Sequence, residues 1–184
     1  MGVTPYTGAM TILLLASLLL QGPPAPKPGP ETERLKPFEG DWTVKGTTLR
    51  GPGEPWIEGT GTDSSRFAHG GLWLRSESEG KIGGGPFSGS GALGWDPLKK
   101  KYVMTYVSST TQGLIQAEGD FDAAGKVLTL SMRAPGPTED NPWRWERIVE
   151  IVGKDTVRMV DRIPVPDAEP IVFGRYEMTR KKAD

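Results

Sequence analysis

The sequence predicts an all-β protein: an antiparallel up-and-down β-barrel of about ten strands, preceded by a short helical turn. Short runs rich in Val, Ile, Thr and aromatic residues recur along the chain, and Gly, Pro, Asp or Asn bounds each run. No apolar pattern of helical period extends beyond two turns after Pro37. A flat sheet of so many strands would leave two unpaired edges, so closure into a barrel is favoured.

The predicted elements follow one another within a single domain. Residues 31–36 are long enough for one helical turn, which Pro37 ends because proline cannot continue a helix. Asp96 and Asp122 each open a turn in which their carboxylates can accept hydrogen bonds from backbone N–H groups. The strands are expected at residues 41–49, 56–67, 72–79, 87–95, 101–108, 113–121, 127–133, 143–152, 156–163 and 171–180.

The N-terminal segment is expected to lie outside this domain. Residues 10–20 form an apolar run of 11 residues, where a bilayer-spanning helix needs about 20. That length is typical of a signal-peptide core, although no Lys or Arg precedes it. We therefore expect a signal peptide at 1–22, a Pro-rich linker at 23–32, a barrel at 33–182, and export to the periplasm or beyond. A buried element of the fold, or an uncleaved membrane anchor, is the alternative for the apolar run.

The composition removes several classes of function. The chain has no Cys, which excludes disulfides, thiolate nucleophiles, iron–sulfur clusters, Cys-ligated zinc and a lipoprotein anchor. Its 22 Lys and Arg nearly balance its 23 Asp and Glu, so the basic footprint of a nucleic-acid-binding protein is missing. The short basic run at residues 99–101 is expected to be a solvent-exposed turn.

A set of short motifs resembles a bacterial family known as domain of unknown function 1579, over residues 33–182. The motifs are Gly40-x-Trp42, Gly70-Gly71, Leu93-Gly94-Trp95-Asp96, Lys101-Tyr102, Glu118-Gly119 and Tyr176-x-x-Thr179-Arg180-Lys181-Lys182. The family is similar to the calycins, whose lipocalin and fatty-acid-binding members hold ligands inside a barrel. The resemblance implies that Arg180 of the last strand packs on Trp42 and seals the barrel base through a cation–π contact. It implies no reaction.

Two local patterns that can indicate chemistry are better explained by structure. Residues 89–94 spell G-x-G-x-x-G, but a dinucleotide site needs a helix beginning at these glycines, and Pro97 follows too soon. A glycine-bearing strand that bends around a barrel is expected instead. His69, the sole histidine, lies in a predicted turn at residues 68–71, and we expect it to be exposed rather than catalytic or a ligand.

The carboxylates and serines give no stronger catalytic signal. No Ser lies in a G-x-S-x-G motif. Two carboxylate pairs have the spacing of a single strand face and are expected to face solvent: Glu77 with Glu79, and Glu146 with Glu150. No catalytic residue, cofactor or metal site is therefore predicted.

One repeated pattern suggests a ligand site. Three strands contain an aromatic residue followed two positions later by Arg, which places both side chains on one strand face. Facing inward, they would line an apolar cavity whose guanidinium groups suit an amphipathic anion. A buried Arg would need a counter-ion, for which Glu77 and Glu177 are candidates. Facing outward, the Arg side chains would cover exposed rings. The candidate ligand-binding residues are Trp73, Arg75, Tyr106, Trp145, Arg147, Phe173 and Arg175.

These observations predict an exported barrel that binds a small apolar or amphipathic, anionic ligand without a cofactor. Two alternatives stay open. The barrel can be filled by side chains and serve as a structural or interaction domain. Less favoured is an enzyme that uses carboxylates, Tyr or Arg of the barrel, which would need a group with a strongly shifted pKa at the mouth of a pocket.

Overall fold

The structure is a computed structural model that describes residues 25–49, 51 and 53–182. The predicted signal peptide at 1–22 and the first two residues of the predicted linker lie outside these residues. In the part of the chain that the structure describes, no helix is long and apolar enough to cross a membrane.

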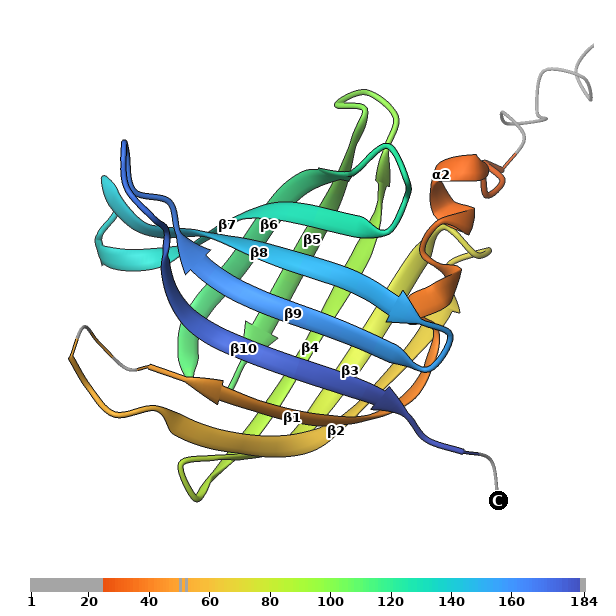
Figure 1. The fold of residues 1–184 in the computed structure, drawn as a ribbon. Helices are drawn as coiled ribbons and strands as arrows, with labels where there is room; N and C mark the ends of the chain where they lie inside the picture. Colours follow the sequence, from red (N-terminus) through yellow and green to blue (C-terminus); the bar gives the residue numbers. More distant parts are fainter. Residues whose placement is uncertain (1–24, 50, 52, 183–184) are drawn as a thin grey trace, which may run out of the picture.

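Ten antiparallel strands close into one barrel (Figure 1). Each strand pairs with the next along the chain, and β1 pairs with β10 to complete the closure. The predicted fold class, strand number and meander order are therefore confirmed. The strands are β1 (Gly40–Thr48), β2 (Ile57–Ala68), β3 (Trp73–Ile82), β4 (Gly85–Asp96), β5 (Lys101–Ser108), β6 (Thr111–Phe121), β7 (Val127–Thr138), β8 (Asn141–Gly153), β9 (Thr156–Ile163) and β10 (Ile171–Arg180).

The two ends of the barrel differ. At one end, called the closed end below, β1 begins, β10 ends, and the segment with α2 (Pro30–Glu33) and the 3-10 helix η1 (Lys36–Phe38) covers the opening (Figure 1). The Tyr102 hydroxyl fastens this segment by donating a hydrogen bond of 2.9 Å to the carbonyl of Glu31. The other end, called the open end, holds the β1–β2, β3–β4, β5–β6, β7–β8 and β9–β10 connections.

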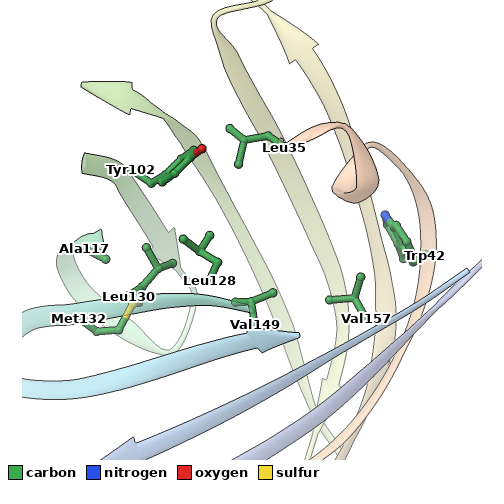
Figure 2. Close-up of a cluster of buried hydrophobic side chains, with 9 residues drawn as sticks. All are labelled: Leu35, Trp42, Tyr102, Ala117, Leu128, Leu130, Met132, Val149 and Val157. Atoms are coloured by element: carbon green, nitrogen blue, oxygen red, sulfur yellow. The ribbon is translucent and has the colours of Figure 1, made fainter. Parts of the chain in front are cut away.

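An apolar core fills the closed half of the barrel. Figure 2 shows Leu35 reaching in from the covering segment toward the strands. Because alternate residues of a strand point to opposite faces, inward positions of β1 and of β5 to β9 form this core together with Leu35. Its buried members are Leu35, Trp42, Tyr102, Ala117, Leu128, Leu130, Met132, Val149 and Val157.

The predicted turn chemistry is present in two hairpins. Asp96 Oδ1 accepts hydrogen bonds from the backbone N–H groups of Leu98 and Lys99, at 2.9 and 3.0 Å. Asp122 Oδ1 accepts from Lys126 and Val127 in the same way, at 2.8 and 3.1 Å. These backbone donors hold the pKa of Asp122 below its ordinary value.

The glycine motif, the sole histidine and the short basic run lie in strands and turns, as the sequence predicted. The G-x-G-x-x-G run lies within the continuous strand β4, and no helix begins there. His69 is an exposed turn residue with a positive φ of 52°. Lys99 and Lys101 flank the β4–β5 turn and pair with Glu118 and Asp120 on the neighbouring strand. The predicted turn and strand at these places are therefore confirmed.

Candidate functional site

The barrel contains a cavity of about 1280 Å³ that reaches from the core to the open end. Side chains at the strand ends form its mouth, and several are large and apolar: Trp143 is 62% exposed and Ile171 is 50% exposed. Drug-sized ligands occupy pockets of roughly 300–1,000 Å³, so this space is large enough for one small molecule.

The cavity has two unlike walls. Strands β1 to β4 contribute many glycine and small polar side chains, beside apolar ones such as Leu74, Phe87 and Leu93. Strands β7 to β10 contribute large apolar side chains. Members of the first wall are Gly46, Gly59, Gly61, Ser65, Ser76 and Ser78, and members of the second are Leu130, Met132, Trp145, Val149, Met159 and Phe173.

Two tyrosine rings of the cavity pack closely against glycines on the neighbouring strands. A Cβ atom on Gly91 would lie 2.7 Å from Cδ2 of Tyr106, and one on Gly89 would overlap the Tyr106 hydroxyl. Tyr176 crosses Gly46 and Gly174 in the same manner, with its ring 3.0 Å from the Cβ position of Gly174. Gly89 and Gly91 of β4 are therefore required by close packing, since a side chain at either position would displace Tyr106.

Burial shapes the acidity of both tyrosines. It raises the pKa of Tyr106, while a hydrogen bond with Ser78 and the charge of Arg147 act in the opposite direction. Burial likewise raises the pKa of Tyr176, and the Asp161 carboxylate adds to the rise. Both hydroxyls are therefore protonated, neutral hydrogen-bonding groups at neutral pH.

An ion pair lies inside the barrel between β8 and β9. Arg147 and Asp161 are direct partners in the strand register, and Asp161 is 3% exposed. Nε and Nη2 of Arg147 donate to Oδ1 and Oδ2 of Asp161 at 2.8 and 2.7 Å. Burial opposes the charge of Arg147, but the attraction and hydrogen bonds of Asp161 outweigh it and raise the pKa of the guanidinium above its usual range.

A second buried carboxylate, Asp63, lies on the small wall. Its side chain lines the cavity and the residue is 9% exposed. Ser65 Oγ donates to its Oδ1 and Ser78 Oγ donates to its Oδ2, both at 2.7 Å. Among the described residues, no Lys, Arg or His forms an ion pair with it. This carboxylate is held by hydroxyl groups alone.

The large wall contains an unsatisfied donor. The rings of Trp145 and Phe173 meet edge to face with centroids 6.4 Å apart, and both line the cavity. The Trp145 indole Nε1 is buried and has no hydrogen-bond partner among the described residues. Buried polar groups are rarely left in this state.

The structure divides the candidate ligand-binding residues into two groups. Tyr106, Trp145, Arg147 and Phe173 line the cavity. The expectation that Trp73, Arg75 and Arg175 do so is corrected, because all three lie on the outer face. Whether any of the four inner residues binds a ligand stays a prediction.

The outward positions follow from strand parity. Leu74 is buried, so its neighbours Trp73 and Arg75 point outward, where Arg75 lies 3.7 Å from Glu77. Arg175 lies over the exposed ring of Trp56, at 5.0 Å from the centroid. These contacts match the alternative in which Arg covers an aromatic ring at the surface.

A β-bulge explains why Phe173 and Arg175 separate. The pairing of β10 with β9 shifts between Val172 and Gly174, so one extra residue is inserted on β10. The alternation of inner and outer positions reverses at that point. Phe173 therefore faces the cavity while Arg175, two residues later, faces solvent.

The expected counter-ions are also corrected. Glu77 and Glu177 lie outside, with Arg75 and Arg158 as partners. Asp161 is the partner of Arg147 instead. Sequence reasoning missed Asp63, Asp161 and Tyr176. The alternation Val157, Met159, Asp161 was a signal, since two apolar inner positions precede the Asp at the same spacing.

The barrel base forms as the lipocalin resemblance implies. Cζ of Arg180 lies 4.2 Å from the centroid of the Trp42 ring. The same guanidinium donates to the carbonyls of Glu39 and Pro37 at 2.5 and 2.9 Å, and Trp42 Nε1 donates to Phe38 at 3.0 Å. Arg180 thereby ties η1 and the chain entering β1 to the end of β10.

No metal-binding group is evident in the described part of the chain, where no three His, Cys, Asp or Glu side chains gather in a ligating arrangement. The described polar residues that line the cavity include Ser, Thr and Tyr hydroxyls, the carboxylates of Asp63 and Glu79, and the cationic side chains of Lys81, Arg144 and Arg147. Their chemistry suits hydrogen bonding and charge pairing.

A closed ten-stranded meander with a sealed base and a cavity open at the other end defines a lipocalin-like β-barrel protein. The model of the family described as "Protein of unknown function (DUF1579)" matches residues 27–180, and the chain belongs to this family. The resemblance drawn from the sequence motifs is therefore confirmed.

Solved structures show the same fold at low sequence identity. The crystal structure of Rv2717c from M. tuberculosis is 16% identical, with a TM-score of 0.62 over 84% of this chain and 99% of that one. The S-type phycobiliprotein lyase CPES from Guillardia theta is 10% identical, with a TM-score of 0.54 over 85% of this chain and 100% of the lyase. A comparison with curated protein sequences found no match.

Proposed function

We propose that this protein binds a small, largely apolar molecule with one polar group inside its barrel. The observation that supports the proposal most is the cavity of about 1280 Å³, which is open at one end and lined by the large apolar wall. In the alternative, a barrel filled by its own side chains, no such space would be present. Export, expected from the apolar run at residues 10–20, stays a prediction.

The charged residues inside the barrel indicate what kind of polar group the ligand carries. The sequence suggested an anionic head held by several Arg residues, but only Arg147 of the three lies inside, and Asp161 already occupies two of its donors. The geometry therefore favours a ligand that is mostly apolar. The apolar wall supplies its contact area, and the polar groups that line the cavity orient it.

Filling the cavity tests the proposal. Gly59 faces the cavity, and a Cβ atom there would meet its nearest neighbours at 3.4 Å, so Gly59→Phe can enter the space without a backbone collision. Binding of the neutral, environment-sensitive dye Nile red would be followed by fluorescence. We expect the full chain to bind the dye and Gly59→Phe to lose about tenfold or more in affinity, because a buried aromatic side chain occupies the same volume.

The matched control is Glu58→Phe, which places the same ring on the exposed outer face of the same strand. We expect its affinity for the dye to equal that of the unaltered chain. Equal losses in the two variants, or no dye binding by the unaltered chain, would contradict the proposal. Native mass spectrometry of the purified chain would then identify any molecule that it already carries.

A further inference from the structure

We propose that the polar group of the ligand is a protonated aliphatic amine that binds Asp63. This inference rests on the proposed function, since it specifies the head group of a molecule held in the same cavity. It replaces the anionic head expected from the sequence.

The first argument is the charge inside the barrel. Within the described residues, the interior holds two buried carboxylates, Asp63 and Asp161, and one guanidinium, that of Arg147. Arg147 is bound to Asp161 through two hydrogen bonds. The other cationic side chains that line the cavity, Lys81 and Arg144, are exposed. Asp63 therefore has no ion-pair partner among the described residues, and a buried carboxylate without a cation is costly. A cationic head group would balance the charge, whereas an anionic one would add a third negative group.

The second argument is the free acceptor capacity of Asp63. Each of its two oxygens accepts one serine hydroxyl, whereas a carboxylate offers about four lone-pair sites. Because Asp63 lines the cavity, the remaining sites can be reached from it. The Tyr106 hydroxyl lies beside Ser78 and close enough to feel the charge of Asp63, so it offers one more acceptor to the same head group.

The third argument is the type of donor that fits. An ammonium group has three N–H donors and no acceptor, which matches a site built from a carboxylate and hydroxyl oxygens. A neutral alcohol could donate one hydrogen bond but would not balance the charge. Both head groups can donate a hydrogen bond to the carboxylate, but only the ammonium adds the attraction between opposite charges, so an amine should be preferred over an alcohol.

The position of the apolar wall sets the course of the ligand body. Asp63 lies near the middle of β2, away from the open end at Ile57. Trp145 and Phe173 lie nearer the open ends of β8 and β10. An alkyl chain that starts at Asp63 would run past these two rings toward the mouth of the cavity.

The test compares three probes that share one alkyl chain: decylamine, decanol and decanoate. Their binding to the full chain at neutral pH would be measured by isothermal titration calorimetry. We expect decylamine to bind about tenfold or more tightly than either other probe, because only its head group carries a positive charge that the Asp63 carboxylate attracts. Equal or tighter binding of decanol or decanoate would overturn the inference and leave the proposed function intact, since the cavity would still take amphiphiles.

A variant locates the site. Asp63→Asn keeps the shape and removes the charge, and we expect it to reduce decylamine affinity about tenfold while decanol affinity stays within about twofold. The control Asp120→Asn makes the same change on the outer face, where Asp120 pairs with Lys101, and should alter neither. An Asp63→Asn variant that binds decylamine normally would overturn the inference.

The head-group comparison on the unaltered chain needs no variant and holds even if Asp63→Asn folds poorly. If no alkyl probe binds but Nile red does, the inference fails alone, and if nothing binds, both proposals fail.

Discussion

Single residues inside the barrel show how polar groups are kept where apolar packing dominates. Arg147 and Asp161 meet across β8 and β9 with both carboxylate oxygens engaged. Asp63 is satisfied by two serine hydroxyls, and Trp145 Nε1 has no partner in the described chain. The Arg147–Asp161 pair is complete, whereas Asp63 lines the cavity and keeps free acceptor capacity. That difference separates structural polar residues from candidate ligand contacts.

The Arg147–Asp161 pair should stabilise the fold. Removing one partner should therefore cost more stability than removing both. We expect Arg147→Met to lower the free energy of unfolding by about 3–5 kcal/mol, because it leaves Asp161 buried without a cation. The double variant Arg147→Met with Asp161→Leu should recover most of this loss, since neither charge remains. Chemical denaturation of the two single variants and the double variant measures the coupling. Additive losses would show that the two side chains do not act as a pair.

At the scale of elements, β4 shows why a glycine pattern can suggest a nucleotide site that is absent. Gly89 and Gly91 are required because the Tyr106 ring of β5 lies against them. The sequence predicted the strand, but the ring contact depends on the pairing register of two strands. That register appears only when the hairpin is formed.

Glycine substitution on β4 tests this contact. We expect Gly91→Ala to cost about 1–3 kcal/mol of stability, because its Cβ would press on both the Tyr106 ring and the Thr105 carbonyl. Gly85→Ala, on the same strand, meets its nearest atom at an ordinary 3.6 Å and should change stability by less than about 0.5 kcal/mol. Thermal unfolding of both variants would decide the matter, and equal tolerance would rule out the packing role of Gly91.

Strand β10 shows where the assignment of strand faces from alternating residues fails. Period two placed Phe173 and Arg175 on one face, which holds for a regular strand. The bulge at Val172/Gly174 breaks the period, and the two side chains separate. In β3 the period is regular, but the sequence did not reveal which face is buried, since Trp73 and Leu74 are both apolar. Of the seven candidate ligand-binding residues predicted from the sequence, therefore, four line the cavity and three lie on the outer face. The prediction missed Asp63, Asp161 and Tyr176.

For the molecule as a whole, the buried tyrosines should make the free energy of unfolding depend on pH in the alkaline range. Burial raises the pKa of Tyr102, Tyr106 and Tyr176 above the ordinary value of 10.0. As the pH rises past about 10, the unfolded chain loses these protons before the folded chain does. The unfolded state then binds fewer protons, so the free energy of unfolding must fall as pH increases.

We therefore expect stability to be level below the ordinary tyrosine pKa and to decline as the pH rises through the raised values. Denaturation at a series of alkaline pH values, combined with the ultraviolet titration of tyrosinate, measures both effects. The variant Tyr106→Phe with Tyr176→Phe should show a smaller decline. The same decline in both proteins would mean that other groups cause it.

The fold and the family could be predicted from the amino-acid sequence. Strand runs, Asp-led turns and the Gly40-x-Trp42 and Arg180 motifs depend on local periodicity and turn chemistry, which are written in consecutive residues. The interior required the folded chain. It shows which face of each strand is buried, that Asp161 rather than Glu77 or Glu177 pairs with Arg147, and that Asp63 has no ion-pair partner among the described residues. Inner and outer faces are settled by register, bulges and barrel closure. These arise between strands that lie side by side in the closed sheet, and the local sequence of one strand does not contain them.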